Sequence, residues 1–595
     1  MPYLALPAVV SACLIAAAAA ALADGQPSSD PERPRSVFWG DTHVHSSWSL
    51  DANLFNNMSL GPDVAFRFAS GEAVDTGGGV IAKLSRPLDF LVVSDHAAYL
   101  GVFRMIRDDH PLVAGSDTAR RIGAVLSGNE SLGPEHITQL SELLEGDDMG
   151  ADRTIQRAVW HDVIDVAERH NAPGRFTAFI GYEWGSTPDG NNLHRNVIFR
   201  DGPERTKKVL PFSAIDSLRP EDLWQYLADY ERDTGGAAFA IPHNMNLSNG
   251  LMFAVEDSSG RPIDAAYANA RATFEPIAEV TQIKGDSEAH PFLSPDDEFA
   301  DFENWDRTNI FGLARTELSM LEGNYARAAL ENGLAVHERV GSNPFKFGMI
   351  GSTDAHTSLA TADDDNYWGK TSNMHPGSGR TEGVFIHSVE GSALSTMNWE
   401  QVASGYAAVW ATANTRGAIF DGLRRKEAYA TTGPRMTVRF FGGWDYEARD
   451  TRSRNLADVG YAKGVPMGGD LPAAAAGSTP TFLVAAVKDP VGANLQRVQI
   501  VKGWLDAGGE SREKVVDVAV AARPAGGATE LSAVWRDPDF DPGTLAFYYA
   551  RVLEVESARW TAYEAKRFGA KIAPGTRMTQ QERAYTSPIW YTPAP

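Results

Sequence analysis

The chain has 595 residues, with 54 Lys and Arg against 77 Asp and Glu, which gives a formal net charge of −23 at pH 7. This negative excess excludes a general nucleic-acid binder, whose affinity depends on neutralising phosphates with cations. The length suffices for a large core and two domains. A small anionic substrate stays compatible with the charge, because bound metal ions make a pocket locally positive.

The N-terminus predicts a secretory signal peptide. Residues 4–22 are almost wholly apolar, and Ala21-Leu22-Ala23 has the pattern of a cleavage site. We expect residues 1–23 to be removed, residues 24–35 to form a linker, and the mature protein to be periplasmic or extracellular, without stable membrane insertion. Two alternatives stay open: an uncleaved anchor helix, because about 20 apolar residues span a bilayer, and lipidation at Cys13.

Cys13 is the only cysteine. Its removal with the signal peptide excludes a disulfide framework, a cysteine nucleophile and thiolate ligands in the mature protein. Any bound metal ion must therefore be held by His, Asp and Glu.

The first predicted strand ends in two histidines one residue apart, His43 and His45. Side chains at positions i and i+2 of a strand point the same way, so both imidazoles can reach one point in space. Two neutral imidazoles directed at one point suit a transition metal. A polar strand end with two solvated histidines is the alternative for this motif alone.

The same pattern, an apolar run that ends in Asp, Glu or His, recurs along the chain. Buried strands are predicted at residues 88–93, 176–182, 237–241, 276–283 and 347–351, followed or ended by His96, Glu183, His243, Lys284, and Asp354 with His356. Helices are predicted between them, and residues 100–171 are predicted to be a helical insertion. This alternation predicts parallel β-α units, and in barrels of that kind active sites lie at the C-terminal strand ends.

The sequence changes character after about residue 436. Short alternating segments, such as residues 481–487 and 497–501, are separated by Pro and Gly. We expect an antiparallel β-sandwich-like domain at residues 436–595. The preceding α/β domain then occupies residues 36–435.

Taken together, these motifs resemble the PHP (polymerase and histidinol phosphatase) superfamily. The segments G-D-T-H-V-H-S, V-S-D-H, G-Y-E-W, N-L-H-R-N-V-I-F, P-H-N and G-S-T-D-A-H resemble more closely a PHP-like branch known as DUF3604. The resemblance covers roughly residues 36–435. It implies a distorted (β/α)7 barrel with a site for two or three divalent metal ions, namely Zn, Mn or Fe.

The resemblance also implies a ligand set. His43, His45, Glu183 and Asp354 resemble the ligands of a first metal ion, and Glu183 would bridge to a second ion held by His194 and His243. His96 and His356 would hold a third ion. In relatives with three ions another histidine lies six positions after the H-x-H motif, where this chain has Asp51. The third site can therefore survive, change its metal preference or be empty.

Other residues are candidates for supporting roles. Asp41 and Asp95 could orient a metal-binding imidazole, and hydrogen bonds to nearby main chain are the alternative. Glu279 could pair with a histidine of the metal site or with Lys284. Lys284 could stabilise a substrate anion or leaving group, or be a solvated lysine. Arg416, with Arg435, could clamp a phosphate or lie on the surface.

The combined pattern favours an exported metal-dependent hydrolase of small, anionic phosphate esters that uses a metal-bound hydroxide. Hydrolysis of carboxylic or carbamate esters on the same metal site is one alternative. A catalytically silent, metal-dependent binding protein is the other. Neither the substrate nor the oligomeric state is specified by the sequence.

Overall fold

The computed structural model describes residues 33–77, 79–127, 134–144 and 149–594. The predicted signal peptide, Cys13 and nearly all of the predicted linker lie outside these residues. No helix in the described part of the chain is long and apolar enough to cross a bilayer.

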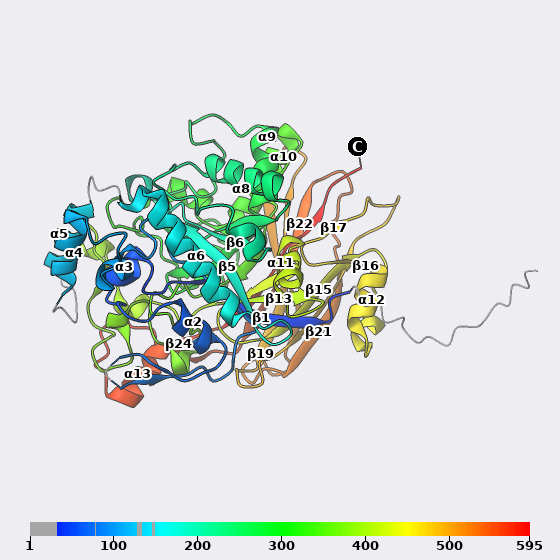
Figure 1. Ribbon diagram of the computed structural model, residues 1–595. Helices are drawn as coiled ribbons and strands as arrows, with labels where there is room; N and C mark the ends of the chain where they lie inside the picture. Colours follow the sequence, from blue (N-terminus) through cyan, green and yellow to red (C-terminus); the bar gives the residue numbers. More distant parts are fainter. Residues whose placement is uncertain (1–32, 78, 128–133, 145–148, 595) are drawn as a thin grey trace, which may run out of the picture.

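A large mixed sheet forms the centre of the molecule (Figure 1). Its first part has the order β14-β13-β1-β4-β5-β6-β7, in which β1, β4 and β5 are parallel and the other neighbours are antiparallel. The bounds are β1 (Ser36–Val44), β4 (Phe90–Val93), β5 (Thr177–Trp184), β6 (Arg195–Phe199), β7 (Ala238–Pro242), β13 (Tyr406–Ala411) and β14 (Ala428–Thr431). β4 and β5 are buried along their whole length, as expected for parallel strands covered on both faces.

Gly40 shows how closely β1 and β4 approach each other. A Cβ atom at this position would lie 2.4 Å from the ring of Phe90, a distance at which no side chain fits. A glycine is therefore required at this position, where β1 pairs with β4. It lies three residues before the first histidine of the H-x-H motif.

A smaller sheet lies beside this one. It has the order β10-β8-β9, with β8 (Ile277–Gln282) and β10 (Gly348–Gly351) parallel and β9 (Gly285–Asp286) antiparallel to β8. β8 contacts β7, and β10 contacts β13 and β14. The mixed α/β class is therefore confirmed. No hydrogen-bonded ladder among the described strands joins β7 to β8 or β10 to β14, so the closed seven-stranded barrel stays a prediction.

Helices cover the outside of these strands (Figure 1). The predicted insertion is helical and contains α3 (Val102–Arg107), α4 (Asp117–Leu126), α5 (Pro134–Leu144) and α6 (Arg153–His170). α8 begins at Pro220 and is followed by Gly235 in the left-handed conformation, in line with the preference for proline at the start of a helix and glycine after its end. The other helices are α1 (Leu50–Leu54), α2 (Pro62–Ala69), α7 (Pro203–Thr206), α8 (Pro220–Thr234), α9 (Ala265–Phe274), α10 (Ala326–Val340), α11 (Arg416–Arg424), α12 (Leu456–Lys463) and α13 (Trp560–Phe568).

The C-terminal part is rich in antiparallel strands. Four of them form a separate sheet of order β16-β15-β18-β21, namely β15 (Thr437–Gly443), β16 (Gly464–Pro466), β18 (Thr481–Val487) and β21 (Glu530–Arg536). Phe482 of this sheet packs against Tyr548, with ring centroids 4.3 Å apart. Tyr548 belongs to the large sheet, so this contact packs the four-stranded sheet against the large sheet.

The large sheet continues across the predicted domain boundary at residue 436. β25 pairs with β14, and β22 pairs with β25, β26 and β19. These strands are β19 (Leu495–Leu505), β20 (Ser511–Val520), β22 (Ala546–Glu554), β25 (Arg583–Thr586) and β26 (Ile589–Tyr591), and β17 (Asp470–Leu471) lies at the edge. The C-terminal strands are thus bonded directly to the strands that carry the predicted site.

Candidate metal centre

The two histidines at the end of β1 are fully buried, and their Nε2 atoms lie 3.2 Å apart. The segment after β10 runs alongside them, because the main-chain N–H of Asp354 donates to His43 and that of His45 donates to Ala355. Asp354 itself has a positive φ of 58°. Such a conformation is uncommon outside glycine, is best tolerated by Asn and Asp, and is found at functional sites.

Donor atoms from distant segments converge beyond this strand end. Oε2 of Glu183 is 2.9 Å from Nε2 of His45 and 3.3 Å from Nε2 of His43. Oδ1 of Asp354 is 3.3 Å and 3.5 Å from Nε2 of His43 and of His45. Tetrahedral ligands about 2.1 Å from a metal ion lie about 3.4 Å from one another. The spacing of these four atoms matches that of ligands around one ion.

The second oxygen of Glu183 faces another pair of imidazoles. Oε1 lies 2.5 Å from Nδ1 of His194 and 3.0 Å from Nε2 of His243. His194 comes from the residue before β6 and His243 from the residue after β7. A carboxylate whose two oxygens face two sets of nitrogens has the arrangement of a ligand that bridges two ions.

Asp51, on the short helix α1, completes a third group. Its Oδ2 lies 2.5 Å from Nε2 of His356 and 3.3 Å from Nε2 of His96. Asp51 thus lies between His96 and His356, which the resemblance implies as ligands of a third ion. The structure places it where a ligand would lie, although the resemblance offers a histidine at this position.

Four groups of atoms in the described residues could hold a metal ion, and all four share members of this one cluster. They are His43 with Glu183 and His243, His43 with His45 and Asp354, His45 with His96 and Glu183, and His45 with Asp51 and His356. The donors are imidazole nitrogens and carboxylate oxygens, which suit Zn, Mn or Fe. The buried His, Glu and Asp groups could therefore bind metal ions.

The charges of the centre also suit cations. Burial by itself would raise the pKa of Glu183 and of Asp354, but the surrounding histidines and lysines hold both well below the usual range. Burial lowers the pKa of His194 to about 4. Burial acts the same way on His43, but Asp354 and other carboxylates outweigh it and raise that pKa to about 10. A metal ion would displace this proton, because imidazole binds metals in its neutral form.

Glu279 supports the first histidine from behind. Its Oε2 accepts a hydrogen bond from Nδ1 of His43 at 3.1 Å, on the opposite side of the ring from the ligand atoms. A carboxylate in this position fixes the tautomer and orientation of a metal-binding imidazole.

Asp41 and Asp95 do not bond to an imidazole. Asp41 accepts hydrogen bonds from the main chain of His43 and from the hydroxyl of Thr353, and Asp95 accepts from the main chain and hydroxyl of Ser46. Burial raises the pKa of each to about 7, against these hydrogen bonds. The alternative, hydrogen bonding to nearby main chain, is what the structure shows, so both carboxyl groups position the segments that carry the ligands.

Two lysines meet at Asp354. Lys284 is buried and donates to Oδ2 of Asp354, and Lys370 donates to Oδ1 and to the main-chain carbonyl of the same residue. Burial lowers the pKa of Lys370 to about 7, opposed by Asp354 and reinforced by Lys284. Lys284 was predicted as a candidate from its strand end. Lys370 was missed, because it lies in a loop and follows no predicted strand.

A polar network also leaves one donor free beside the lysines. The main-chain N–H of Lys284 donates to Oε1 of Gln282, so Nε2 of Gln282 is the donor to Oδ1 of Asn244 and Oδ2 of Asp354. Because Oδ1 of Asn244 accepts this hydrogen bond, the other atom of the Asn244 amide is the donor Nδ2. Its Nδ2 is buried and has no hydrogen-bond partner, and its φ is 49°.

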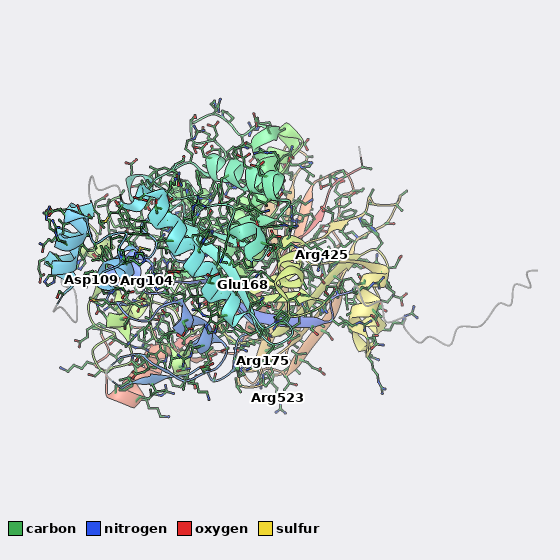
Figure 2. The ribbon with its side chains drawn as sticks, viewed as in Figure 1. Arg104, Asp109, Glu168, Arg175, Arg425 and Arg523 are labelled. Atoms are coloured by element: carbon green, nitrogen blue, oxygen red, sulfur yellow. The ribbon has the colours of Figure 1, made fainter. Side chains whose placement is uncertain are left out.

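Arg416 lies elsewhere, and the structure does not bring it to the metal centre. Its guanidinium donates to the carbonyl of Ala178 near the start of β5, and pairs with Glu168 at 2.8 Å. Glu168 lies on α6 (Figure 2). Glu183, by contrast, is at the other end of β5. Residue type alone suggested a phosphate ligand, but this arginine ties α11 to β5 and α6.

The centre opens to solvent on one side. The side chains of Asp51, His96 and His194 are 26%, 15% and 13% exposed, whereas those of His43 and His45 are 1% exposed. Gly185 lies between the two partly exposed imidazoles, and a Cβ atom there would be 2.6 Å from Nδ1 of His96. Solvent therefore reaches the second and third groups, whereas His43 and His45 are shielded from it.

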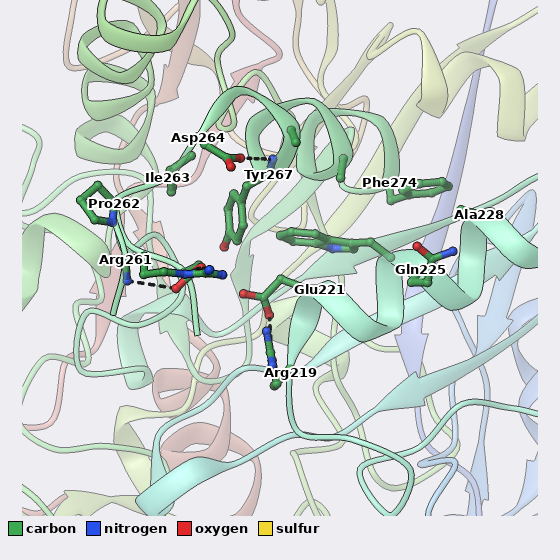
Figure 3. A pocket seen from close by; sticks show the side chains of 14 residues that line it. Arg219, Glu221, Gln225, Ala228, Arg261, Pro262, Ile263, Asp264, Tyr267 and Phe274 are labelled. Carbon is green, nitrogen blue, oxygen red and sulfur yellow. Dashed lines mark hydrogen bonds and ion pairs between the residues drawn. The ribbon is translucent and has the colours of Figure 1, made fainter. Parts of the chain in front are cut away.

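A separate cavity of about 440 Å³ lies between α8 and α9 (Figure 3). None of the residues of the metal centre lines it. Its charged groups are used locally, because Arg261 pairs with Asp257, Glu221 accepts from Ser258, and Asp264 caps α9. None of the candidate ligand groups in the described residues lines this cavity, so the metal centre is the candidate site.

Comparison with known proteins gives one result. The chain matches the family model described as "Protein of unknown function (DUF3604)" over residues 32–526 and 522–593. No curated protein matches the chain. No solved structure matches it either.

Proposed function

Since this chain belongs to the DUF3604 family of proteins of unknown function, its activity has to follow from its own site, and we propose that it is a metal-dependent hydrolase of phosphate esters. The buried His, Glu and Asp groups support this proposal. The predicted signal peptide adds that the enzyme acts outside the cytoplasm. The proposed link to the PHP superfamily rests on the motifs alone.

In this proposal each ion has its own set of ligands. His43, His45, Glu183 and Asp354 would hold the first, and Glu183 would share the second with His194 and His243. Asp51, His96 and His356 would hold a third. Such ions lower the pKa of bound water and polarise a phosphoryl oxygen.

The two lysines on Asp354 are the observation that favours phosphate over neutral esters. Lys284 and Lys370 both donate to a carboxylate that would also bind an ion, and each adds a positive charge there when it is protonated. Once ions are present, the four carboxylates of Asp51, Glu183, Glu279 and Asp354 no longer balance the cations. The pocket then has a net positive charge and attracts an anion, although the whole chain is acidic.

Other side chains have defined tasks in this proposal. Glu279 keeps the His43 ring oriented, and Gln282 keeps the amide of Asn244 turned so that Nδ2 is available. Nδ2 of Asn244, together with Lys284 or Lys370, would donate to oxygens of the substrate where negative charge develops. Water is excluded from the buried side of the centre, so these electrostatic interactions are strong there.

The experiment is a panel of chromogenic esters, tested with the purified protein after chelation and after reloading with Mn or Zn. The proposal predicts turnover of phosphomonoesters or phosphodiesters that depends on metal. Turnover of carboxylic or carbamate esters alone would show the alternative hydrolase. Metal uptake without turnover of any ester would show a binding protein and contradict the proposal.

A further inference from the structure

Phe55 is an exposed aromatic residue beside the metal centre. It comes directly after α1, and its main-chain N–H donates to the carbonyl of Asp51 at 2.9 Å. Residues four apart on a helical turn lie on the same face, so Phe55 follows Asp51 on the side of α1 that reaches the centre. Phe55 is 40% exposed, and the side chain of Asp51 is 26% exposed.

Three rings form a row from the interior to this surface. The ring centroids of His45 and His356 are 4.1 Å apart, and those of His356 and Phe55 are 6.0 Å apart. The side chains of His45 and His356 are only 1% and 5% exposed. Phe55 is therefore the outermost ring of the row, and it lies next to two of the proposed metal ligands.

Hydrogen bonds hold the segment that carries Phe55. The side-chain amide of Asn53 donates to two main-chain carbonyls of the segment after β1, and that of Asn57 donates to the carbonyl of His356 at 3.1 Å. Between them, Asn56 has a positive φ of 72°, a conformation that is found at functional sites. Because the segment is already ordered, a ligand that contacts this ring loses little affinity to ordering.

The loop that carries Lys370 runs along the same segment. The main-chain carbonyl of Lys370 accepts a hydrogen bond from the N–H of His356 at 2.8 Å. Three residues later, Oδ1 of Asn373 accepts a hydrogen bond of 3.1 Å from Nδ2 of Asn56. His356 thus contacts both this loop and the ring of Phe55, so the ring lies close to the proposed phosphate donor.

We propose that Phe55 determines substrate specificity by contacting the organic group of the ester, so that the enzyme prefers phosphate esters of aromatic alcohols to those of small aliphatic alcohols. This inference rests on the proposed phosphoesterase function. The phosphate would lie at the ions and Lys370, and the aromatic group would pack on the solvent-facing side of the ring. Aromatic rings whose centroids are about 4.5–7 Å apart attract one another beyond the burial of their area.

The test compares benzyl phosphate with ethyl phosphate, whose leaving alcohols are of similar acidity, on the full chain with its metal centre loaded. We expect kcat/KM to be at least about tenfold higher for benzyl phosphate. The variant Phe55→Ala should lose this preference through a higher KM for benzyl phosphate, with kcat almost unchanged, because the contact is made equally in the ground state and the transition state. Phe55→Tyr should keep the preference.

Two controls separate specificity from structure. Phe568→Ala removes a ring of similar exposure, 44%, from the end of α13 and should leave both rates unchanged. The metal content of Phe55→Ala should equal that of the wild type, and its kcat/KM for ethyl phosphate should stay within about twofold. If Phe55 merely held Asp51 and His356 in place, its loss would lower the metal content and the kcat for both esters.

Binding of benzylphosphonate and ethylphosphonate, measured by calorimetry, tests the same preference without turnover. If no phosphate ester is hydrolysed, the proposed function fails, but tighter binding of benzylphosphonate that is lost in Phe55→Ala still supports the contact with Phe55. Three results would overturn the inference: equal affinity of the wild type for the two phosphonates or no binding of either, an undiminished preference in Phe55→Ala, or loss of metal ions from that variant.

Discussion

Oε2 of Glu279 lies 3.1 Å from Nδ1 of His43, the ring nitrogen that faces away from the other ligand atoms. This contact holds the imidazole so that Nε2 faces Glu183, His45 and Asp354. β8 therefore contributes to the centre through Glu279, and Gln282 of the same strand donates to Oδ2 of Asp354.

The variant Glu279→Gln tests this support. Glutamine keeps the shape of the side chain but is a weaker acceptor, so the affinity for the first metal ion should fall about 10- to 100-fold. Competition with a chelator measures the affinity. Glu298→Gln, at a side chain that is 74% exposed, is the control. Equal affinities in the two variants would show that Glu279 has no part in metal binding.

Replacing Lys370 should impair catalysis more than metal binding. The variant Lys370→Met removes a donor and a charge beside Asp354, and we expect kcat/KM for an anionic phosphate ester to fall about 10²- to 10³-fold. Metal content by mass spectrometry should be unchanged. Lys346→Met, at a partly exposed lysine that pairs with Asp470, should keep full activity. A Lys370→Met enzyme with wild-type kcat/KM would remove this lysine from the site.

Asn244 allows its backbone and its side chain to be tested separately. Glycine accepts the positive φ of this residue but lacks Nδ2, whereas alanine lacks the donor and is also strained by about 1 kcal/mol. We expect Asn244→Gly to keep the melting temperature and lose at least about tenfold in kcat. Asn244→Ala should have both a lower melting temperature and a lower kcat. Full kcat in Asn244→Gly would mean that Nδ2 serves structure only.

Stability should depend on pH through Glu331 of α10. Burial, with the nearby carboxylate of Glu513, raises the pKa of Glu331 from 4.5 to about 8, and its Oε1 has no partner. Between these pH values the folded state holds a proton that the unfolded state has lost, so stability falls as the pH rises. The advantage of Glu331→Gln over the wild type should therefore grow from about pH 5 to about pH 8 in denaturant titrations. An advantage independent of pH would contradict the raised pKa.

The sequence located most of the candidate site because each of its main residues ends an apolar run. The apolar composition of four segments predicts buried strands, at or after whose ends lie His43, Glu183, His243 and Asp354. Strand ends on one edge of a sheet lie close together. Asp51 was marked by its spacing from the H-x-H motif. The structure brings all of these side chains into one cluster with His45, His96 and His356, and His194 joins it through Glu183.

Residues outside that rule were harder to place. Lys370 reaches Asp354 from a loop, and loop paths depend on tertiary packing rather than on local pattern. Arg416 was selected by residue type, which carries no information about which end of β5 it contacts. The continuous sheet through β14 and β25 was also not predicted, because the pairing of strands more than 150 residues apart leaves no local signal.

The most direct test is the metal content of the purified protein measured alongside its phosphoesterase activity. The account predicts two or three Zn, Mn or Fe ions per chain, loss of turnover on chelation, recovery on reloading, and loss of both ions and turnover in Glu183→Gln. A chain that binds no such ion, or a Glu183→Gln variant that hydrolyses phosphate esters as the wild type does, would contradict it.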